Sequence, residues 1–517
     1  MPPLTHSPGL LLTNANVITV DDRRPRADTV LVKGSRILGV GRKDGLEAAG
    51  LGWATAIDCG GMTLVPGFID AHCHVLAYAS SLLAVDCRPS AVDSIDEIRQ
   101  ALSARATETP AGQWVRGVGY HESELRDKRH PTRWDLDKAA PHHPVRLIHR
   151  GGHGCVLNSV ALARVGISMD TPEPPGGTID RHRETGEPTG LLLEMDGLLD
   201  ERIPSLGEEE LLRGLRLAGR SLASMGITSV QDATHTNSTR RWDFLLKLKA
   251  NEVFSQRITM MVGSNHLPGF LDRGLRFGDG VENLNVGAVK FMLTSTTGRI
   301  HPSKVELQTA VTLAREAGFQ IAVHAIEAEA VDAAVEALAG GPDASPPHGR
   351  DRIEHCSESS PSSLKRLSES GLLVVTQPGF IYHSGRRYLS EVPADILPWL
   401  YWIGSFQEGG LGPAFASDAP VIDPNPLLGI YAAVTRRAAS GDTLSAGEKV
   451  TALEALRMYT LNGAYAAFQE GDKGTIQAGK LADLVLLDAD PTAVEPERIR
   501  DIRPVMTMIG GRVVWEA

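Results

Sequence analysis

Residues 64–74, Leu-Val-Pro-Gly-Phe-Ile-Asp-Ala-His-Cys-His, join a short apolar run to two histidines that stand two positions apart. The apolar part, Leu64–Ile69, has the length and composition of a buried β-strand. Side chains at positions i and i+2 of a strand point to the same face, so the imidazoles of His72 and His74 can reach one metal ion. Alone, the pair favours the plainer interpretation of one packed and one solvated histidine.

Short apolar strands alternate with helical patterns through the middle of the chain, which indicates repeated βαβ units. Some helix signals are distinct: Ser360 is a candidate N-cap with Pro361 at the first helical position, and Gly371 lies just past the helix end. Glu306–Ala317 repeats apolar side chains at helical spacing and stops at Gly318. The predicted strands are Leu64–Ile69, Ile227–Gln231, Ile258–Val262, Val286–Leu293, Phe319–Ala325, Arg352–His355, Leu372–Gln377 and Gly412–Ser417.

Eight such units favour an α/β fold built on a distorted (β/α)8 TIM barrel, with a doubly wound open sheet as the alternative. Strand patterns with turn signals at both chain ends predict a small composite β-sandwich domain. About 150 residues separate the first two barrel strands, far more than an ordinary connection, which predicts an inserted subdomain covering the barrel mouth. The turn-rich centre of this insert, Thr171–Gly190, favours an ordered loop. The predicted boundaries are 1–63 with 472–517 for the sandwich, 64–76 with 205–471 for the barrel, and 77–204 for the insert.

Composition limits the partners that we expect. With 42% hydrophobic and 22% charged residues, the chain resembles folded rather than disordered proteins. Its formal charge of -11, without a basic cluster, argues against nucleic acid. No window approaches the roughly 18 apolar residues of a membrane span, and Met1–Val20 lacks the pattern of a secretory signal, so we expect a cytoplasmic protein without membrane contact. Homo-oligomer formation is left open.

Polar side chains also end other predicted barrel strands. Lys290, His324, His355 and Asp418 each stand where a strand meets its following loop, which is where barrel enzymes build active sites. Each has a plainer explanation: Lys290 reaching solvent from a strand edge, packed core histidines, and Asp418 capping a helix. Five strands that all end in a metal-binding or titratable group are improbable as coincidence. We therefore interpret these residues, with the histidine pair, as one site.

This order of residues resembles the metal and catalytic pattern of the amidohydrolase superfamily: His-x-His on strand one, Lys on four, His on five and six, and Asp on eight. The chain is most similar to the branch of YtcJ-like proteins and N-substituted formamide deformylases. The resemblance covers nearly the whole chain. Further segments that carry it are Leu64–Asp70, Gly152-His153-Gly154 with Asn158-Ser159, Gly226–Asp232 and Lys480–Val485.

The resemblance implies one or two divalent metal ions per chain. Its ligands would be His72 and His74 at the more buried ion, His324 and His355 at the second, and Lys290 between them as an N6-carboxylated lysine. A plain ammonium cannot be a ligand because it has three donors and no acceptor. Zinc suits the imidazole-rich set, while manganese, nickel and iron are left open.

The implied reaction is hydrolysis of a non-peptide carbon–nitrogen bond in a small molecule, such as an amide, formamide or cyclic amide. A divalent ion lowers the pKa of its water from roughly 16 to about 7 and polarises the substrate carbonyl. Asp418 would accept the proton from that water and pass it to the departing nitrogen. In the family this aspartate also ligates the metal.

Two alternatives remain. Glu327 gives a His-x-x-Glu pattern that the superfamily also has in mononuclear deaminases, where the glutamate carries a proton to a ring nitrogen. Its plainer interpretation is an acidic residue in the first turn of the next helix. The second alternative is a non-catalytic metal-binding regulatory protein, against which the complete ligand set with Asp418 argues.

Substrate recognition is less well determined. His153 and Tyr120 in the insert are candidate substrate contacts, although His153 could equally order its glycine-rich turn. Thr294–Thr297 replaces the Asp-Gly that often follows the strand-four lysine in the family, which leaves the substrate and the number of metals open.

Overall fold

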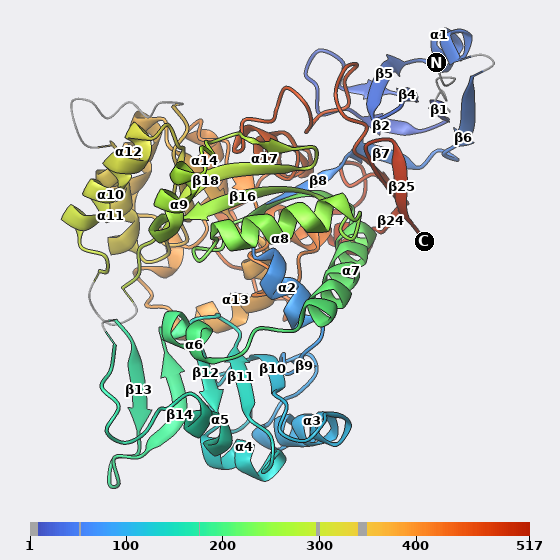
Figure 1. Cartoon of the computed structure of the whole chain (residues 1–517). Coiled ribbons are helices and arrows are strands. Elements are labelled where there is room, and N and C mark those ends of the chain that lie inside the picture. The colour runs from blue at the N-terminus through green and yellow to red at the C-terminus, as the bar shows by residue number, and fades with distance from the viewer. Residues whose placement is uncertain (1–8, 51–52, 175, 296–299, 340–348) are drawn as a thin grey trace. The chain divides into compact units, whose positions relative to one another are not determined.

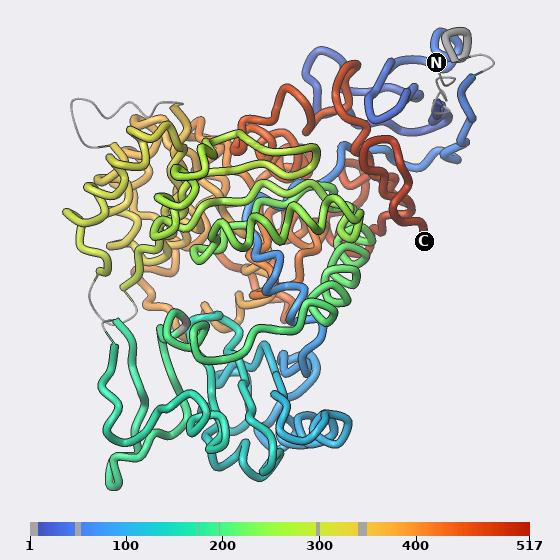
Figure 2. The backbone as a smooth tube through the Cα atoms, viewed as in Figure 1, coloured from blue at the N-terminus to red at the C-terminus, as the bar shows by residue number. Residues whose placement is uncertain are grey.

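The computed structural model describes residues 9–50, 53–174, 176–295, 300–339 and 349–517. The chain divides into two compact units, residues 1–75 with 219–517 and residues 76–218. Figures 1 and 2 show the course of the backbone, in which the blue N-terminal and red C-terminal segments of the first unit lie side by side. The predicted domain boundaries, and the position of the insert over the barrel mouth, remain predictions.

A nearly closed barrel of eight parallel strands forms the centre of the first unit, which confirms the TIM barrel over the open sheet. Its strand order is β22-β21-β20-β19-β18-β16-β15-β8, with the short β17 (Gly280–Val281) added to β18. Beyond the strands, Asp418 N donates to His72 O (2.8 Å) and His74 N donates to Ala419 O (2.9 Å), so the ends of the first and last strands meet. The strands are β8 Phe68–Cys73, β15 Ile227–Asp232, β16 Arg257–Gly263, β18 Leu284–Met292, β19 Ile321–Ala325, β20 Arg352–His355, β21 Leu373–Thr376 and β22 Ala414–Phe415.

The predicted first barrel strand, Leu64–Ile69, is divided between two sheets. Its first half lies in β7 (Thr63–Pro66), which pairs with strands of the β-sandwich, and the barrel strand β8 begins only at Phe68. The chain crosses at Gly67, where a Cβ atom would overlap the side chain of Thr228. Both halves are apolar and consecutive, so hydrophobic patterning could not reveal the boundary between them.

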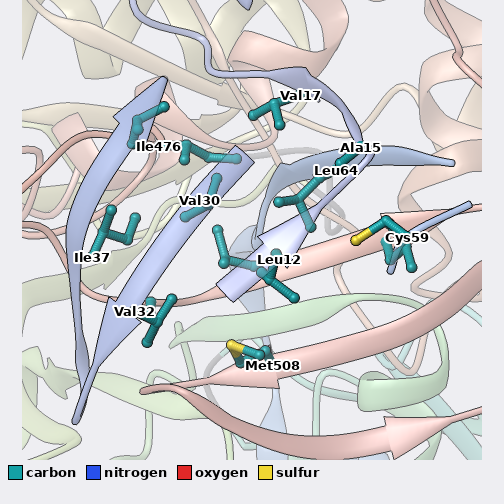
Figure 3. Packing of buried hydrophobic residues seen from close by; sticks show 14 of the residues in the cluster. Leu12, Ala15, Val17, Val30, Val32, Ile37, Cys59, Leu64, Ile476 and Met508 are labelled. Atoms are coloured by element: carbon teal, nitrogen blue, oxygen red, sulfur yellow. The ribbon is translucent and has the colours of Figure 1, made fainter. Parts of the chain in front are cut away.

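Strands from both chain ends form two sheets, which confirms the composite β-sandwich. Their orders are β5-β4-β1-β6 and β25-β24-β23-β7-β2-β3. Leu12 and Val30 from one sheet pack with Leu64 and Met508 from the other in a common core (Figure 3). The remaining elements are β1 Gly9–Thr13, β2 Asn16–Ile18, β3 Arg26–Ala27, β4 Thr29–Lys33, β5 Arg36–Gly41, α1 Lys43–Gly50, β6 Ala54–Asp58, β23 Leu484–Leu487, β24 Pro504–Ile509 and β25 Arg512–Glu516.

Helices follow the barrel strands, and α12 begins and ends at the residues that its sequence signals predict. Ser360 accepts from the Ser363 backbone N–H at the start of α12, and Gly371 ends it with φ 69°. Among the described residues, none of the helices is both long and apolar enough to span a bilayer. The helices are α8 Thr239–Ala250, α9 Leu267–Asp272, α10 Lys304–Glu316, α11 Ala328–Ala339, α12 Pro361–Ser370, α13 Gly379–Glu391, α14 Ile403–Glu408, α15 Pro426–Thr435, α16 Ala452–Met458 and α17 Leu461–Tyr465.

The second unit has its own mixed sheet, β13-β14-β12-β11-β10-β9. Part of the loop predicted over Thr171–Gly190 is a hairpin of β13 and β14 that turns at Gly186 (φ 74°), while Pro175 lies outside the described residues. β14 begins at Pro188. The sequence did not predict this strand, because proline was interpreted as a sign of a loop, although it is tolerated as the first residue of a strand. The helices at its two boundaries, shared with the first unit, are α2 Val75–Ser81 and α7 Glu208–Ser224. The elements between them are β9 Val85–Asp86, α3 Ile95–Glu108, β10 Val115–Tyr120, α4 Arg133–Ala139, β11 Val145–His149, β12 Gly154–Leu157, α5 Ser159–Arg164, β13 Thr178–Arg181, β14 Pro188–Leu193 and α6 Asp196–Arg202.

Candidate metal centre

Side chains from the carboxyl ends of β8, β20 and β22 converge on one point of the barrel. His72, His355 and Asp418 are buried and offer ligand atoms that all lie within 4.8 Å of one another. Asp418 Oδ1 lies 3.4 Å from His72 Nε2 and 3.1 Å from His74 Nε2. Two ligands on a tetrahedral ion with bonds of about 2.1 Å lie roughly 3.4 Å apart. The spacing therefore fits a divalent cation.

His324 and Lys290 lie next to this group on β19 and β18. The ring centroids of His324 and His355 are 4.4 Å apart, and those of His72 and His355 are 4.7 Å apart. Lys290 is 1% exposed, and its Nζ has no hydrogen-bond partner in the described part of the chain. An orphaned buried amine beside several imidazoles fits a lysine that is modified or bridged when the site is filled. The structure thus groups the ligand atoms of three predicted ligands closely enough for one ion, and the other three predicted ligands lie beside them.

Burial sets the protonation states that metal ligands need. It lowers the pKa of His72 well below its usual value, and the charge of Lys290 lowers it further. Burial likewise lowers the pKa of His355 to about 4. For Asp418, burial raises the pKa, but the contacts with the nearby histidines, the one with His74 Nε2 first, outweigh this and hold it below the usual range. Near pH 7 the buried rings are neutral and Asp418 is ionised, as metal binding requires.

Each of three site histidines has its Nδ1 against a side-chain oxygen from another strand or its following loop. His72 Nδ1 lies 2.5 Å from Glu354 Oε2, His74 Nδ1 3.0 Å from Thr234 Oγ1, and His355 Nδ1 3.0 Å from Gln377 Oε1. Such contacts orient a ligand ring and leave Nε2 for the metal. These three partners were not among the residues predicted from the sequence. Their only signal was a polar residue near the end of a predicted strand.

The backbone at the site is held in uncommon conformations. His355 (φ 70°) and Asp418 (φ 61°) both lie in the left-handed region. For residues other than glycine such conformations cost on the order of 1–3 kcal/mol and concentrate at functional sites. Asp70 supports this arrangement, because its Oδ1 accepts from Ser417 N (3.0 Å) and its Oδ2 contacts Ser417 Oγ (2.5 Å). This role of Asp70 was not predicted from the sequence.

The other predicted site residues lie elsewhere. Glu327 directly precedes α11, one residue before the first turn in which its plainer interpretation placed it, and in the described part of the chain no hydrogen bond or ion pair joins it to the six side chains. Tyr120 is fully buried in the core of the second unit with its hydroxyl 3.1 Å from His130 Nδ1, which favours a structural role. His153 Nδ1 lies 3.2 Å from Glu194 Oε1, and its contact with substrate remains a prediction. Thr296 and Thr297 lie outside the described residues.

Several known proteins with a similar sequence or fold are named as hydrolases. An N-substituted formamide deformylase from Arthrobacter pascens is 31% identical, and the match covers 99% of both chains. The protein YtcJ of Bacillus subtilis (strain 168), named as an amidohydrolase, is 28% identical over 97% of this chain and 98% of its own. A metal-dependent hydrolase from Pyrococcus horikoshii shares the fold, with a TM-score of 0.76 and 22% identity over 95% of this chain and 99% of its own.

The match to a family model extends across the sandwich, the barrel and the insert. It runs from residue 55 to residue 515, and its description is the amidohydrolase family. The buried imidazole and carboxylate cluster is the kind of site that a metal-dependent hydrolase needs, and it lies at the carboxyl ends of the barrel strands, where barrel enzymes catalyse. The chain belongs to the amidohydrolase family and is a metal-dependent hydrolase.

Proposed function

We propose that this enzyme hydrolyses the carbon–nitrogen bond of a small amide-like molecule, with an N-substituted formamide as the first substrate class to test. The observation that carries this proposal is the convergence of His72, His355 and Asp418 on one point, with the rings neutral and the carboxylate ionised. The formamide class is supported by the name of the Arthrobacter pascens relative. Amides and cyclic amides suit the same centre.

The proposed ligands are the six side chains His72, His74, Lys290, His324, His355 and Asp418. A divalent ion at such a site supplies a water of lowered pKa and polarises the substrate carbonyl. We propose one or two zinc ions, because imidazole nitrogens dominate the set. Burial lowers the pKa of Lys290 from its usual value to about 8, which increases the fraction of neutral amine near pH 7 that can react with carbon dioxide and become an N6-carboxylated, anionic ligand.

Asp418 is the proposed proton carrier. Its carboxylate is ionised, buried and joined to His74 Nε2 at 3.1 Å, so it can take a proton from the attacking water without first losing one of its own. It would then donate that proton to the departing nitrogen, which would otherwise leave as an unstable anion. General acid–base catalysis of this kind contributes about 10²–10⁴-fold.

A substrate panel with elemental analysis tests the proposal. An N-substituted formamide, a cyclic amide and an aminated heterocycle should be incubated with purified enzyme while amine, ring-opened product and ammonia are measured separately. Hydrolysis of either amide supports the proposal. Ammonia release from the heterocycle alone would support the deaminase alternative.

Two alanine variants test whether metal binding and activity depend on the proposed ligands. We expect His72→Ala and His74→Ala to lose most of the metal and the activity, and the loss should be greater for His72, whose side chain is 1% exposed against 25% for His74. Undiminished metal in both variants would reject these ligands.

A further inference from the structure

We propose that Glu354, held by Arg352, is a positioning residue that fixes His72 in the tautomer required for metal binding. The inference rests on the proposed function in one respect, namely that His72 is a ligand. It assigns a role to a buried ion pair that belongs to neither the ligand set nor the apolar core.

The contacts are short and fully buried. Glu354 is 0% exposed and Arg352 is 1% exposed. Glu354 Oε2 lies 2.5 Å from His72 Nδ1, on the side of the ring opposite Asp418. Arg352 donates through Nε to Glu354 Oε1 and through a terminal nitrogen to Oε2 at 3.1 Å. Both carboxylate oxygens therefore accept hydrogen bonds from the guanidinium, and one also faces the histidine.

This geometry determines where the proton of His72 resides. A neutral imidazole carries one N–H, and an ionised carboxylate can only accept. Nδ1 must therefore donate to Glu354, which leaves the lone pair on Nε2, 3.4 Å from Asp418 Oδ1. The hydroxyl of Thr234, and the amide of Gln377 once its oxygen and nitrogen exchange places, could also offer a donor to the Nδ1 atoms of the other two histidines. Of these three partners, only Glu354 permits a single tautomer.

Arg352 does more than neutralise Glu354. Its terminal nitrogens also donate to Gln231 Oε1 (2.5 Å) and to the backbone oxygen of Ala71 (2.7 Å). Ala71 directly precedes His72, so one guanidinium holds both the carboxylate behind the ring and the backbone that carries it. A buried ion pair is weak grounds for stability, since well-packed apolar residues often replace one at no cost. The gain in stability alone does not explain why Arg352 and Glu354 are paired here, whereas a role in orienting His72 does.

The test is the zinc affinity of Glu354→Gln. Glutamine has the same size, but Arg352 will retain its oxygen and turn its NH₂ group toward His72 Nδ1, which favours the tautomer with the proton on Nε2. The zinc-loaded, full-length enzyme should be equilibrated with a chromophoric chelator to obtain the zinc dissociation constant, and Tm should be measured on the same sample. We expect zinc binding about 10–100-fold weaker than in the wild type, the usual effect of losing a partner behind a ligand.

Asp351→Asn is the matched control. Asp351 directly precedes Arg352, is also buried, and pairs with Arg315 at 2.7 Å while accepting from Ile321 N at 2.8 Å. Neither of these partners is a proposed metal ligand. We expect this variant to lower Tm and to leave the zinc dissociation constant within about twofold of the wild type.

The outcomes separate this inference from the proposed function. If His72→Ala keeps its zinc, the ligand assignment itself fails. If His72→Ala loses zinc but Glu354→Gln binds it as tightly as Asp351→Asn does, the positioning role is overturned and the pair is only structural. Should Glu354→Gln not fold, Glu354→Asp replaces it, because a carboxylate withdrawn by one methylene lengthens the contact to Nδ1. Weaker zinc binding then supports the role, and wild-type binding overturns it.

Discussion

At the residue scale, Asp418 combines features that a helix cap would not need. It is buried, it contacts two histidines through one oxygen, and its backbone lies in the left-handed region. The carboxylate of a cap accepts from backbone N–H groups of the first helical turn, whereas that of Asp418 faces histidine nitrogens. The environment of Asp418 thus favours the role in proton transfer over the capping role.

Asp418→Asn tests that role directly. The carboxamide keeps the size of the side chain and can still contact a metal through its oxygen, but it cannot accept a proton from water. We expect the fold and much of the metal to remain while kcat falls by about 10²–10⁴-fold. Elemental analysis and steady-state kinetics check both parts. A kcat within a few-fold of the wild type would show that Asp418 is not the proton carrier.

Lys290 and Glu327 distinguish the two enzymatic alternatives at the same scale. An unmodified buried lysine would be a cation beside metal ions, so Lys290→Ala should improve metal binding if the lysine is a bystander and abolish it if the lysine is a carboxylated bridge. We expect loss of metal and activity together. Glu327→Gln should leave amide hydrolysis largely intact, because this residue directly precedes α11, outside the cluster. If Lys290→Ala keeps its metal and activity while Glu327→Gln loses activity, the mononuclear deaminase is supported instead.

At the scale of elements, local signals were reliable and boundaries between sheets were not. The Ser-Pro start and glycine end of α12 depend on backbone chemistry within a few residues, so the sequence predicts them correctly. The division of Leu64–Ile69 between β7 and β8 depends on pairing with β23, more than 400 residues away along the chain. The apolar pattern of a segment does not indicate which of two sheets the segment will join.

Gly67 tests the crossing between those two sheets. A Cβ atom at this position would overlap Thr228, whose side chain is buried on β15. Overpacking of this kind costs typically about 1–3 kcal/mol, so Gly67→Ala should lower Tm. Gly45→Ala is the control, because that glycine lies in α1 with nothing within 4 Å of an added Cβ. Equal Tm values for the two variants would contradict a steric requirement at the crossing.

At the scale of the whole molecule, the ligands were predictable because barrel topology brings strand ends together. His72, Lys290, His355 and Asp418 are far apart in sequence, yet each follows an apolar strand, and parallel strands of one barrel end on the same side. The residues behind them were not predictable in this way. Glu354 and Arg352 act across the barrel interior, and their partners, His72 and Gln231, follow only from the closed three-dimensional arrangement.

Lys473 is a buried lysine outside the proposed ligand set. It is 5% exposed, donates to Ser229 Oγ of β15 (2.8 Å), and lines a cavity of about 230 Å³ that none of the six proposed ligands lines. Burial lowers the pKa of Lys473 to about 7, although the charge of Asp483 opposes the shift. Folding therefore favours the neutral amine, whereas the unfolded chain keeps the proton up to its ordinary value near 10.5.

The sign of the resulting pH dependence follows from proton counting. Between about pH 7 and 10.5 the unfolded state binds more protons at this residue, so the free energy of unfolding rises with pH, by up to about 1.4 kcal/mol per pH unit for one full proton. Lys473→Met removes the titrating group and fills similar space. We expect the increase in Tm between pH 7 and pH 9 to be smaller in the variant than in the wild type, measured by thermal unfolding at fixed ionic strength. Parallel pH curves for the two proteins would mean that Lys473 stays protonated in the folded enzyme, with its charge balanced by Asp483 and by water in the cavity.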